Sequence, residues 1–269
     1  MSATIYKHEF FSRLKSVLVW SVSLMLLVLF FFSIFQSFAD QAALLNEMMA
    51  QFPPALLEAF GITKTDLSSV LGYFSFLLVF VQLCLAIQAG NYGFGLVSIE
   101  ETELTADFLL TKPVSRLQII TSKLLVAFSC LLLTDLAVTA STFIAIALLS
   151  GGRPYDTGTL GLLLVSMLIL QLFFLSVGMV ISLLVHRVRS VTPYSLALGF
   201  GAYILAAFSG IFGDVKLEYI TPFKQIDAAY IVLHNAYDMP LLLVNLAVTV
   251  VALLASYALY LRRDIPTAS

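Results

Sequence analysis

Long uninterrupted runs of apolar residues alternate with short polar segments along the chain. Six runs are long enough for a helix to cross a bilayer, which takes about 20 apolar residues. They cover residues 17–38, 70–99, 124–149, 160–185, 193–212 and 241–261. Pro193 and Pro240 stand where the first turn of a span begins, where a missing N–H is tolerated, and Asp238 is a suitable N-cap for the last span. The pattern predicts an all-α polytopic membrane protein with six transmembrane helices.

Composition supports this class. Of the 269 residues, 60% are hydrophobic and 11% are charged, whereas a soluble domain has about 45–50% apolar and about 25% charged residues. An ordinary soluble enzyme, a nucleic-acid binder, a disordered chain and a secreted disulfide scaffold are therefore excluded. The net charge of -2 indicates neither an acidic nor a basic partner. Cys84 and Cys130 lie inside apolar runs and are expected to pack as small core residues.

The distribution of Lys and Arg predicts the orientation, because cytoplasmic loops carry the excess of positive charge. With the N-terminus inside, ten of the 14 basic residues fall in inner segments: Lys7, Arg13, Lys15, Lys112, Arg116, Lys123, Arg187, Arg189, Arg262 and Arg263. The outer segments hold four: Lys64, Arg153, Lys216 and Lys224. We therefore expect cytoplasmic N- and C-termini. No linker divides the chain, so residues 1–269 are expected to form a single membrane domain.

Two outer segments have helical periodicity. After the first span, one apolar face comprises Leu44, Leu45, Met48, Met49 and Phe52, and after Pro53-Pro54 it continues with Leu56, Leu57 and Phe60. An amphipathic helix in the outer interface is favoured here, and a loop packed on the span ends is the alternative. After the fifth span, Thr221-Pro222-Phe223 precedes a second helical pattern: Ile226, Ala229, Tyr230, Leu233 and Tyr237. This pattern predicts an interfacial or re-entrant helix.

The inner segment between spans two and three, residues 98–123, is the most informative. Acidic residues fill its first half and basic residues its second, which complements a helix dipole. Pro113 divides it into a short helix over about 101–110 and a second piece that starts at Ser115 and leads into span three. The short helix presents Leu104, Phe108 and Leu109 beside its acids. This apolar ridge either docks on a partner or packs back on the bundle, and the residues favour neither.

The same segment resembles the cytosolic coupling segment of ABC-2-type transporter permeases. That family has an acid-rich stretch, then Leu-Leu-x-x-Pro-Val-Ser-Arg, then a Lys that opens the next span. The matching positions here are Leu109, Leu110, Pro113, Val114, Ser115, Arg116 and Lys123. Thr221-Pro222-Phe223 looks like the family's Ser/Thr-Pro-Phe element, and Tyr260 to Ile265 resembles its usual tail. With six spans and an inner N-terminus, the resemblance covers essentially the whole chain.

The resemblance implies the permease subunit of an ATP-driven exporter. Two permease subunits, identical or related, would form the substrate pathway as a dimer in the lipid bilayer. Two separate ATPase subunits would bind ATP and Mg and dock on the coupling helices, so this chain would need no cofactor of its own. Candidate substrates are drugs, antimicrobial peptides, polysaccharides, lipids or ions, and the expected location is the plasma membrane of a bacterium or archaeon. The expected ATPase-docking residues are Glu100, Glu101, Leu104, Phe108, Leu109 and Arg116.

The residues themselves give little support for an enzyme. The chain has no G-x-x-x-x-G-K-[ST] phosphate loop, so ATP hydrolysis is expected elsewhere. The glycines of residues 90–95 are expected to allow close helix packing. No H-E-x-x-H zinc motif occurs. Residues 207–210 match an intramembrane serine-protease turn only in part, because its first glycine is absent. Asp156 and Asp214 resemble an aspartyl-protease pair, but both fall at outer span ends, where carboxylates are solvated.

Asp135 is the single acid deep within a predicted span, and Thr139 and Thr142 follow on the same helical stripe. An ionisable residue at this depth usually faces the bundle or a wet cavity. It is either a pathway or ion site, or an interhelical hydrogen-bonding group, and the second is favoured. The alternatives for the whole protein are an ion-coupled secondary transporter that uses Asp135, and a non-transporting membrane scaffold.

Overall fold

The computed structural model describes residues 3–41, 47–48, 51–53, 57, 65–102, 115–185, 190–209 and 217–262, with the backbone alone for residues 97–102. These residues form long helices and short helical segments, and no strand is found among them. The long helices are α1 (Ala3–Ser33), α5 (Val70–Thr102), α7 (Arg116–Leu149), α8 (Thr157–Leu184), α9 (Val191–Ser209) and α12 (Met239–Arg262). The short ones are α2 (Phe35–Asp40), η1 (Leu217–Tyr219), α10 (Pro222–Gln225) and α11 (Ala228–His234).

The six predicted spans are confirmed. Among the described residues, six helices are long and apolar enough to cross a membrane: Thr4–Asp40, Val70–Leu96, Arg116–Leu149, Thr157–Leu184, Val191–Ser209 and Met239–Arg262. The first and third begin well before the predicted apolar runs, because backbone hydrogen bonding continues into polar turns that need not enter lipid. Pro193 and Pro240 lie in the first turns of α9 and α12. Asp238 caps α12 by accepting from the backbone N–H of Leu241 at 3.4 Å.

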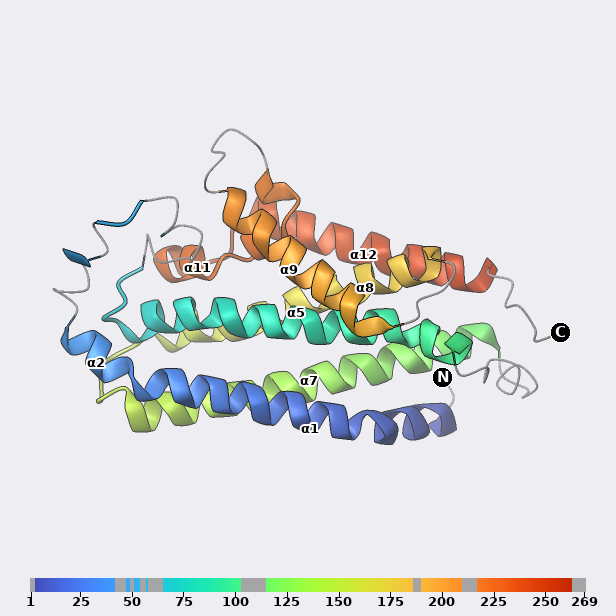
Figure 1. The fold of residues 1–269 in the computed structure, drawn as a ribbon, viewed down its shortest axis with the longest axis horizontal. Helices are drawn as coiled ribbons and strands as arrows, with labels where there is room; N and C mark the ends of the chain where they lie inside the picture. Colours follow the sequence, from blue (N-terminus) through green and yellow to red (C-terminus); the bar gives the residue numbers. More distant parts are fainter. Residues whose placement is uncertain are drawn as a thin grey trace.

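The helices form a bundle in which α5 is the central element (Figure 1). Its span is the most buried of the six, and it packs against α8 along most of its length and against α9. At the periphery of the bundle, α1 lies along α7, and α12 lies along α8. Figure 1 shows the start of α1, the end of α5, the start of α7 and the end of α12 at one end of the bundle, here called the terminal end. The short helices α2 and α11 lie at the opposite end.

A cluster of aromatic side chains fills the bundle near the opposite end, where α1 meets α5. Phe32 and Phe35 pack on the ring of Tyr73, and Phe32 also packs on Phe74. All four side chains are at most 1% exposed. The hydroxyl of Tyr73 donates to the carbonyl oxygen of Phe31 at 2.7 Å, so this phenol is satisfied within the apolar cluster.

The first predicted outer helix lies mostly outside the described residues. Glu47, Met48 and Leu57 have helical backbone, and Met48 and Phe52 are about half exposed. The interfacial helix after the first span therefore remains a prediction.

The second outer segment does contain a helix, α11, which packs against α5 and α8. Its predicted face is wrong in part, because the buried residues are Ala228, Ala229 and Ile231, while Leu233 is 48% exposed. The cause is the shortness of the helix, which is capped at Asp227 and ends at Asn235 in a left-handed conformation (φ 52°). A single helix with one apolar face across residues 226–237 therefore does not form.

Candidate functional site

The predicted coupling segment joins the end of α5 to the start of α7 at the terminal end. The backbone of α5 is helical through Thr102, so it includes Glu100 and Glu101, whose side chains are outside the description. Residues 103–114, with Leu104, Phe108 and Leu109, also lie outside the described residues. Their docking role stays a prediction. Arg116, the last of the predicted docking residues, is half-buried in the first turn of α7.

The end of this segment is fixed by a capping box at the start of α7. Ser115 Oγ accepts from the backbone N–H of Gln118 at 3.3 Å, and Gln118 Oε1 accepts from the backbone N–H of Ser115 at 3.2 Å. This pair satisfies two N–H groups that the helix start would otherwise leave without partners. The predicted helix start at Ser115 is confirmed, and the chain enters α7 at a defined point.

Asp135 lies between helices and is 6% exposed. The amide of Gln171 on α8, fully buried, faces its carboxylate. With the amide nitrogen turned toward the acid, Nε2 donates to Oδ2 at 2.9 Å and to Oδ1 at 3.2 Å. The geometry is that of an interhelical bridge from α7 to α8, one of the two interpretations that the sequence left open.

The two threonines predicted on the same stripe have different surroundings. Thr142 is fully buried, and its hydroxyl donates to the carbonyl oxygen of Val138 on its own helix at 2.9 Å. Thr139 is half-buried. Among the described residues, Asp135 makes the side-chain hydrogen bond that crosses from this stripe to another helix.

Two further buried pairs connect α5 to the same two helices. Gln88 Nε2 donates to the hydroxyl of Thr134 on α7 at 2.9 Å, and Gln82 Nε2 donates to the hydroxyl of Ser166 on α8 at 3.2 Å. Together with the α7–α8 bridge they link α5, α7 and α8 pairwise. Gln171, Thr134 and Ser166 were not predicted as hydrogen-bond partners from the sequence. Their signal was a polar residue inside an apolar run, which in a membrane often marks a helix contact.

Glycines allow the close approach of α5 to its neighbours, as predicted for residues 90–95. A Cβ added to Gly93 would lie 2.4 Å from the carbonyl oxygen of Leu175 on α8. A Cβ on Gly90 would lie 3.2 Å from Cβ of Ser195 on α9. The packing role is confirmed for these two positions.

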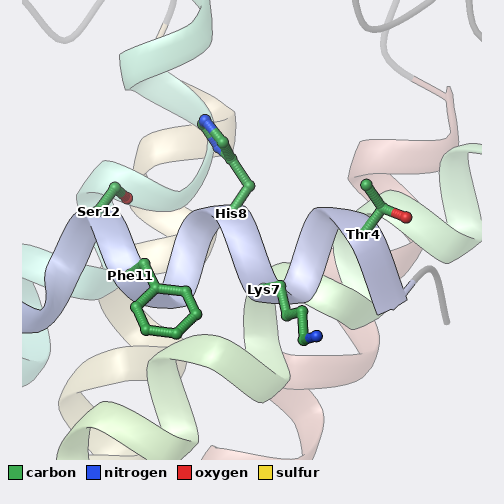
Figure 2. Close-up of a pocket in the computed structure, with 5 residues that line it drawn as sticks. All are labelled: Thr4, Lys7, His8, Phe11 and Ser12. Atoms are coloured by element: carbon green, nitrogen blue, oxygen red, sulfur yellow. The ribbon is translucent and has the colours of Figure 1, made fainter.

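The terminal end also carries a shallow hollow on α1. It has a volume of about 700 Å³ and is lined by Thr4, Lys7, His8, Phe11 and Ser12. Figure 2 shows these five side chains on successive turns of one helix. Phe11 is 65% exposed. A basic and aromatic face just before the apolar part of α1 is typical of a helix at a membrane–water boundary.

At the opposite end, a smaller cavity of about 110 Å³ lies between η1, α10, α11 and the start of α12. Its lining includes Glu218, Lys224, Asp227 and Asp238, and Lys224 Nζ lies 3.8 Å from Asp227 Oδ2. No group of three or more His, Cys, Asp and Glu side chains that could hold a metal ion occurs in the described part of the chain.

Six long apolar helices, with α5 at the centre of the bundle and buried polar pairs between α5, α7 and α8, define a multi-pass helical membrane protein. The sequence model described as ABC-2 family transporter protein matches residues 3–265. The chain therefore belongs to the ABC-2 transporter family, whose members are membrane components of transporters. No curated relative matches the chain.

Proposed function

We propose that the chain is the permease subunit of an ATP-driven ABC exporter. Two permease subunits, identical or related, form the pathway, and two separate ATPase subunits bind ATP and Mg. The observation that carries this proposal is the family match over residues 3–265, which includes all six long helices and the segment between α5 and α7. The terminal end faces the cytoplasm, as the excess of Lys and Arg there favours. The substrate is a drug, an antimicrobial peptide, a polysaccharide, a lipid or an ion.

In this proposal the coupling segment, from the last turns of α5 to the first turns of α7, receives the ATPase. Glu100, Glu101 and Arg116 provide charged contacts, and Leu104, Phe108 and Leu109 provide the apolar ridge. Closure of the paired ATPases on ATP pushes the segment, and the attached helices tilt to open the pathway outward. The capping box at Ser115 supports this role, because a segment that transmits force has to enter its helix at a fixed point.

The test is the affinity of the partner ATPase for the purified chain in lipid nanodiscs. The ATPase is first identified by mass spectrometry of the complex purified in detergent. Phe108→Ala is expected to cost about 2 kcal/mol, the threshold for an interface hot spot, which lowers the affinity about thirtyfold. Glu101→Lys is expected to act in the same direction, with a larger effect at low salt.

The matched control is Phe200→Ala, since Phe200 is 45% exposed on α9 and belongs to a span. It removes the same side chain without touching the cytosolic segment, so the affinity is expected to stay within twofold. If both segment variants bind the ATPase as tightly as the parent, the segment is an ordinary loop and the proposal loses its mechanism.

A further inference from the structure

Lys123 is a buried cation on α7, at the end of the coupling segment. Its side chain is 4% exposed. Its Nζ donates to the carbonyl oxygen of Leu96 on α5 at 2.8 Å and lies 3.7 Å from Oε1 of Glu9 on α1. One ammonium group of α7 therefore contacts two other helices, α5 and α1, at the terminal end.

The contact with Leu96 is a specific one. Leu96 lies inside α5, which continues to Thr102, so its carbonyl oxygen already has a helical partner and offers its second lone pair to the ammonium. A buried ammonium is costly unless it is paired and hydrogen-bonded. Separation of α5 from α7 at this level would leave the charge of Lys123 without these partners, so the two helices are held together here.

Glu9 extends the contact into α1. Its carboxylate also faces Arg13, with Nε 3.5 Å from Oε2, and the Arg13 guanidinium lies over the ring of Tyr92 on α5, 5.5 Å from its centroid. One turn before Glu9, the hydroxyls of Tyr6 on α1 and Ser129 on α7 are 2.9 Å apart. Polar contacts therefore join α1 to both α5 and α7.

The positions of Leu96 and Lys123 in the sequence relate their contact to the coupling segment. Leu96 stands just before the coupling segment in the sequence and Lys123 is the last residue of that segment, so the hydrogen bond between them joins its two ends. We propose that Lys123 is a positioning residue that holds both ends of the coupling segment together and, through Glu9, attaches them to α1. A displacement of the segment then moves α1, α5 and α7 as one body. The joint movement of the three helices rests on the proposed function. The bond between Lys123 and Leu96 does not depend on that function.

The test is hydrogen–deuterium exchange on the whole chain in lipid nanodiscs. Lys123→Met keeps an unbranched side chain and removes the ammonium. Amide exchange of residues 97–102, the last turns of α5, is expected to rise at least tenfold. The matched control is Gln88→Met, which removes another bond between α5 and α7, deeper in the bundle, and is expected to leave this exchange within twofold of the parent.

A second variant covers the case in which Lys123→Met does not fold. Glu9→Gln leaves the Lys123 contact with Leu96 and removes the charge pairing with α1. It is expected to raise exchange in residues 4–12 of α1 at least threefold while residues 97–102 keep their protection. Unchanged exchange in both variants would overturn the proposal, and so would an equal rise over all six long helices, which would indicate general destabilisation.

The proposed joint movement of α1, α5 and α7 is tested on the complex of the chain with the ATPase. In the parent, ATP with vanadate is expected to change exchange in residues 4–12 of α1. In Lys123→Met this response is expected to be lost while the ATPase affinity stays within threefold. A response in α1 that persists in this variant would overturn the coupling through Lys123. Absence of ATPase binding to the parent would instead contradict the proposed function and leave the exchange result on the bond between Lys123 and Leu96 valid.

Discussion

The carboxylate of Asp135 on α7 and the amide of Gln171 on α8 meet with Nε2 2.9 Å from Oδ2 and 3.2 Å from Oδ1. Both side chains are buried, at 6% and 0% exposure. α7 and α8 touch less extensively than α5 and α8 do, and this polar bridge is one of the contacts between them. In lipid, such a bridge replaces hydrogen bonds that water cannot supply.

The first prediction concerns the strength of this bridge. In a double-mutant cycle with Asp135→Leu and Gln171→Leu, the coupling free energy is expected to be about 0.6 kcal/mol and at most about 1.7 kcal/mol, the range for interhelical hydrogen bonds in membranes. Unfolding in mixed detergent micelles measures it. A coupling free energy of zero would show that the two groups do not interact.

The second prediction separates a structural from a functional Asp135. Asp135→Asn is expected to retain assembly, ATPase binding and most export, because an amide still donates and accepts hydrogen bonds. Export from cells is scored against expression level and ATPase co-purification. Loss of export with normal values of the other two would identify Asp135 as a proton or ion site.

The third prediction uses two glycines with opposite surroundings. In Gly93→Ala the new Cβ would meet the backbone of Leu175 at 2.4 Å, which cannot move aside as a flexible side chain could. We expect a loss of about 1–3 kcal/mol of stability, as for other overpacked sites. Gly201→Ala on α9 is the control, because nothing lies within 4 Å of its Cβ, and a gain of up to about 1 kcal/mol from helix propensity is expected. Equal thermal stabilities of the two variants would contradict the close α5–α8 contact.

The spans could be predicted from the sequence because lipid imposes a length of apolar residues that a pattern shows directly. The start of α7 at Ser115 and the packing of Gly93 were also predictable, since a cap and a small residue act locally. The partner of Asp135 was not, because it depends on how α7 and α8 are rotated toward each other. Lys123 was counted among the positive charges of the inner segments, a count that does not distinguish a solvated ammonium from a buried one.

The fourth prediction concerns pH at the start of α8. Asp156 caps this helix: its Oδ2 accepts from the hydroxyl and from the backbone N–H of Thr159, both at 2.7 Å. These bonds hold the pKa of Asp156 below its usual range. A lowered folded-state pKa means that the contribution of the charged cap is complete above the unfolded-state pKa, about 3.9, and is lost as the pH falls through the folded-state value.

The measurement is thermal unfolding in nanodiscs at a series of pH values from about 6 down to about 2, which brackets the ordinary aspartate pKa. The parent is expected to lose more stability over the acidic part of this range than Asp156→Asn. The amide oxygen of that variant can still cap the helix and does not titrate. Parallel curves for the two proteins would show that the charge of Asp156 contributes nothing to stability.

The last prediction concerns the orientation of the bundle, which the count of Lys and Arg favours and on which the ATPase site depends. In a background that lacks Cys84 and Cys130, Leu233→Cys places a thiol on α11 at the opposite end, where the Leu233 side chain is 48% exposed. Thr4→Cys places one on an exposed turn of α1 at the terminal end. A membrane-impermeant maleimide added to intact cells is expected to label Leu233→Cys alone, and both variants after permeabilisation. Labelling of Thr4→Cys in intact cells would put the terminal end outside, where no ATP is available to an ATPase, and would therefore contradict the exporter assignment together with the topology.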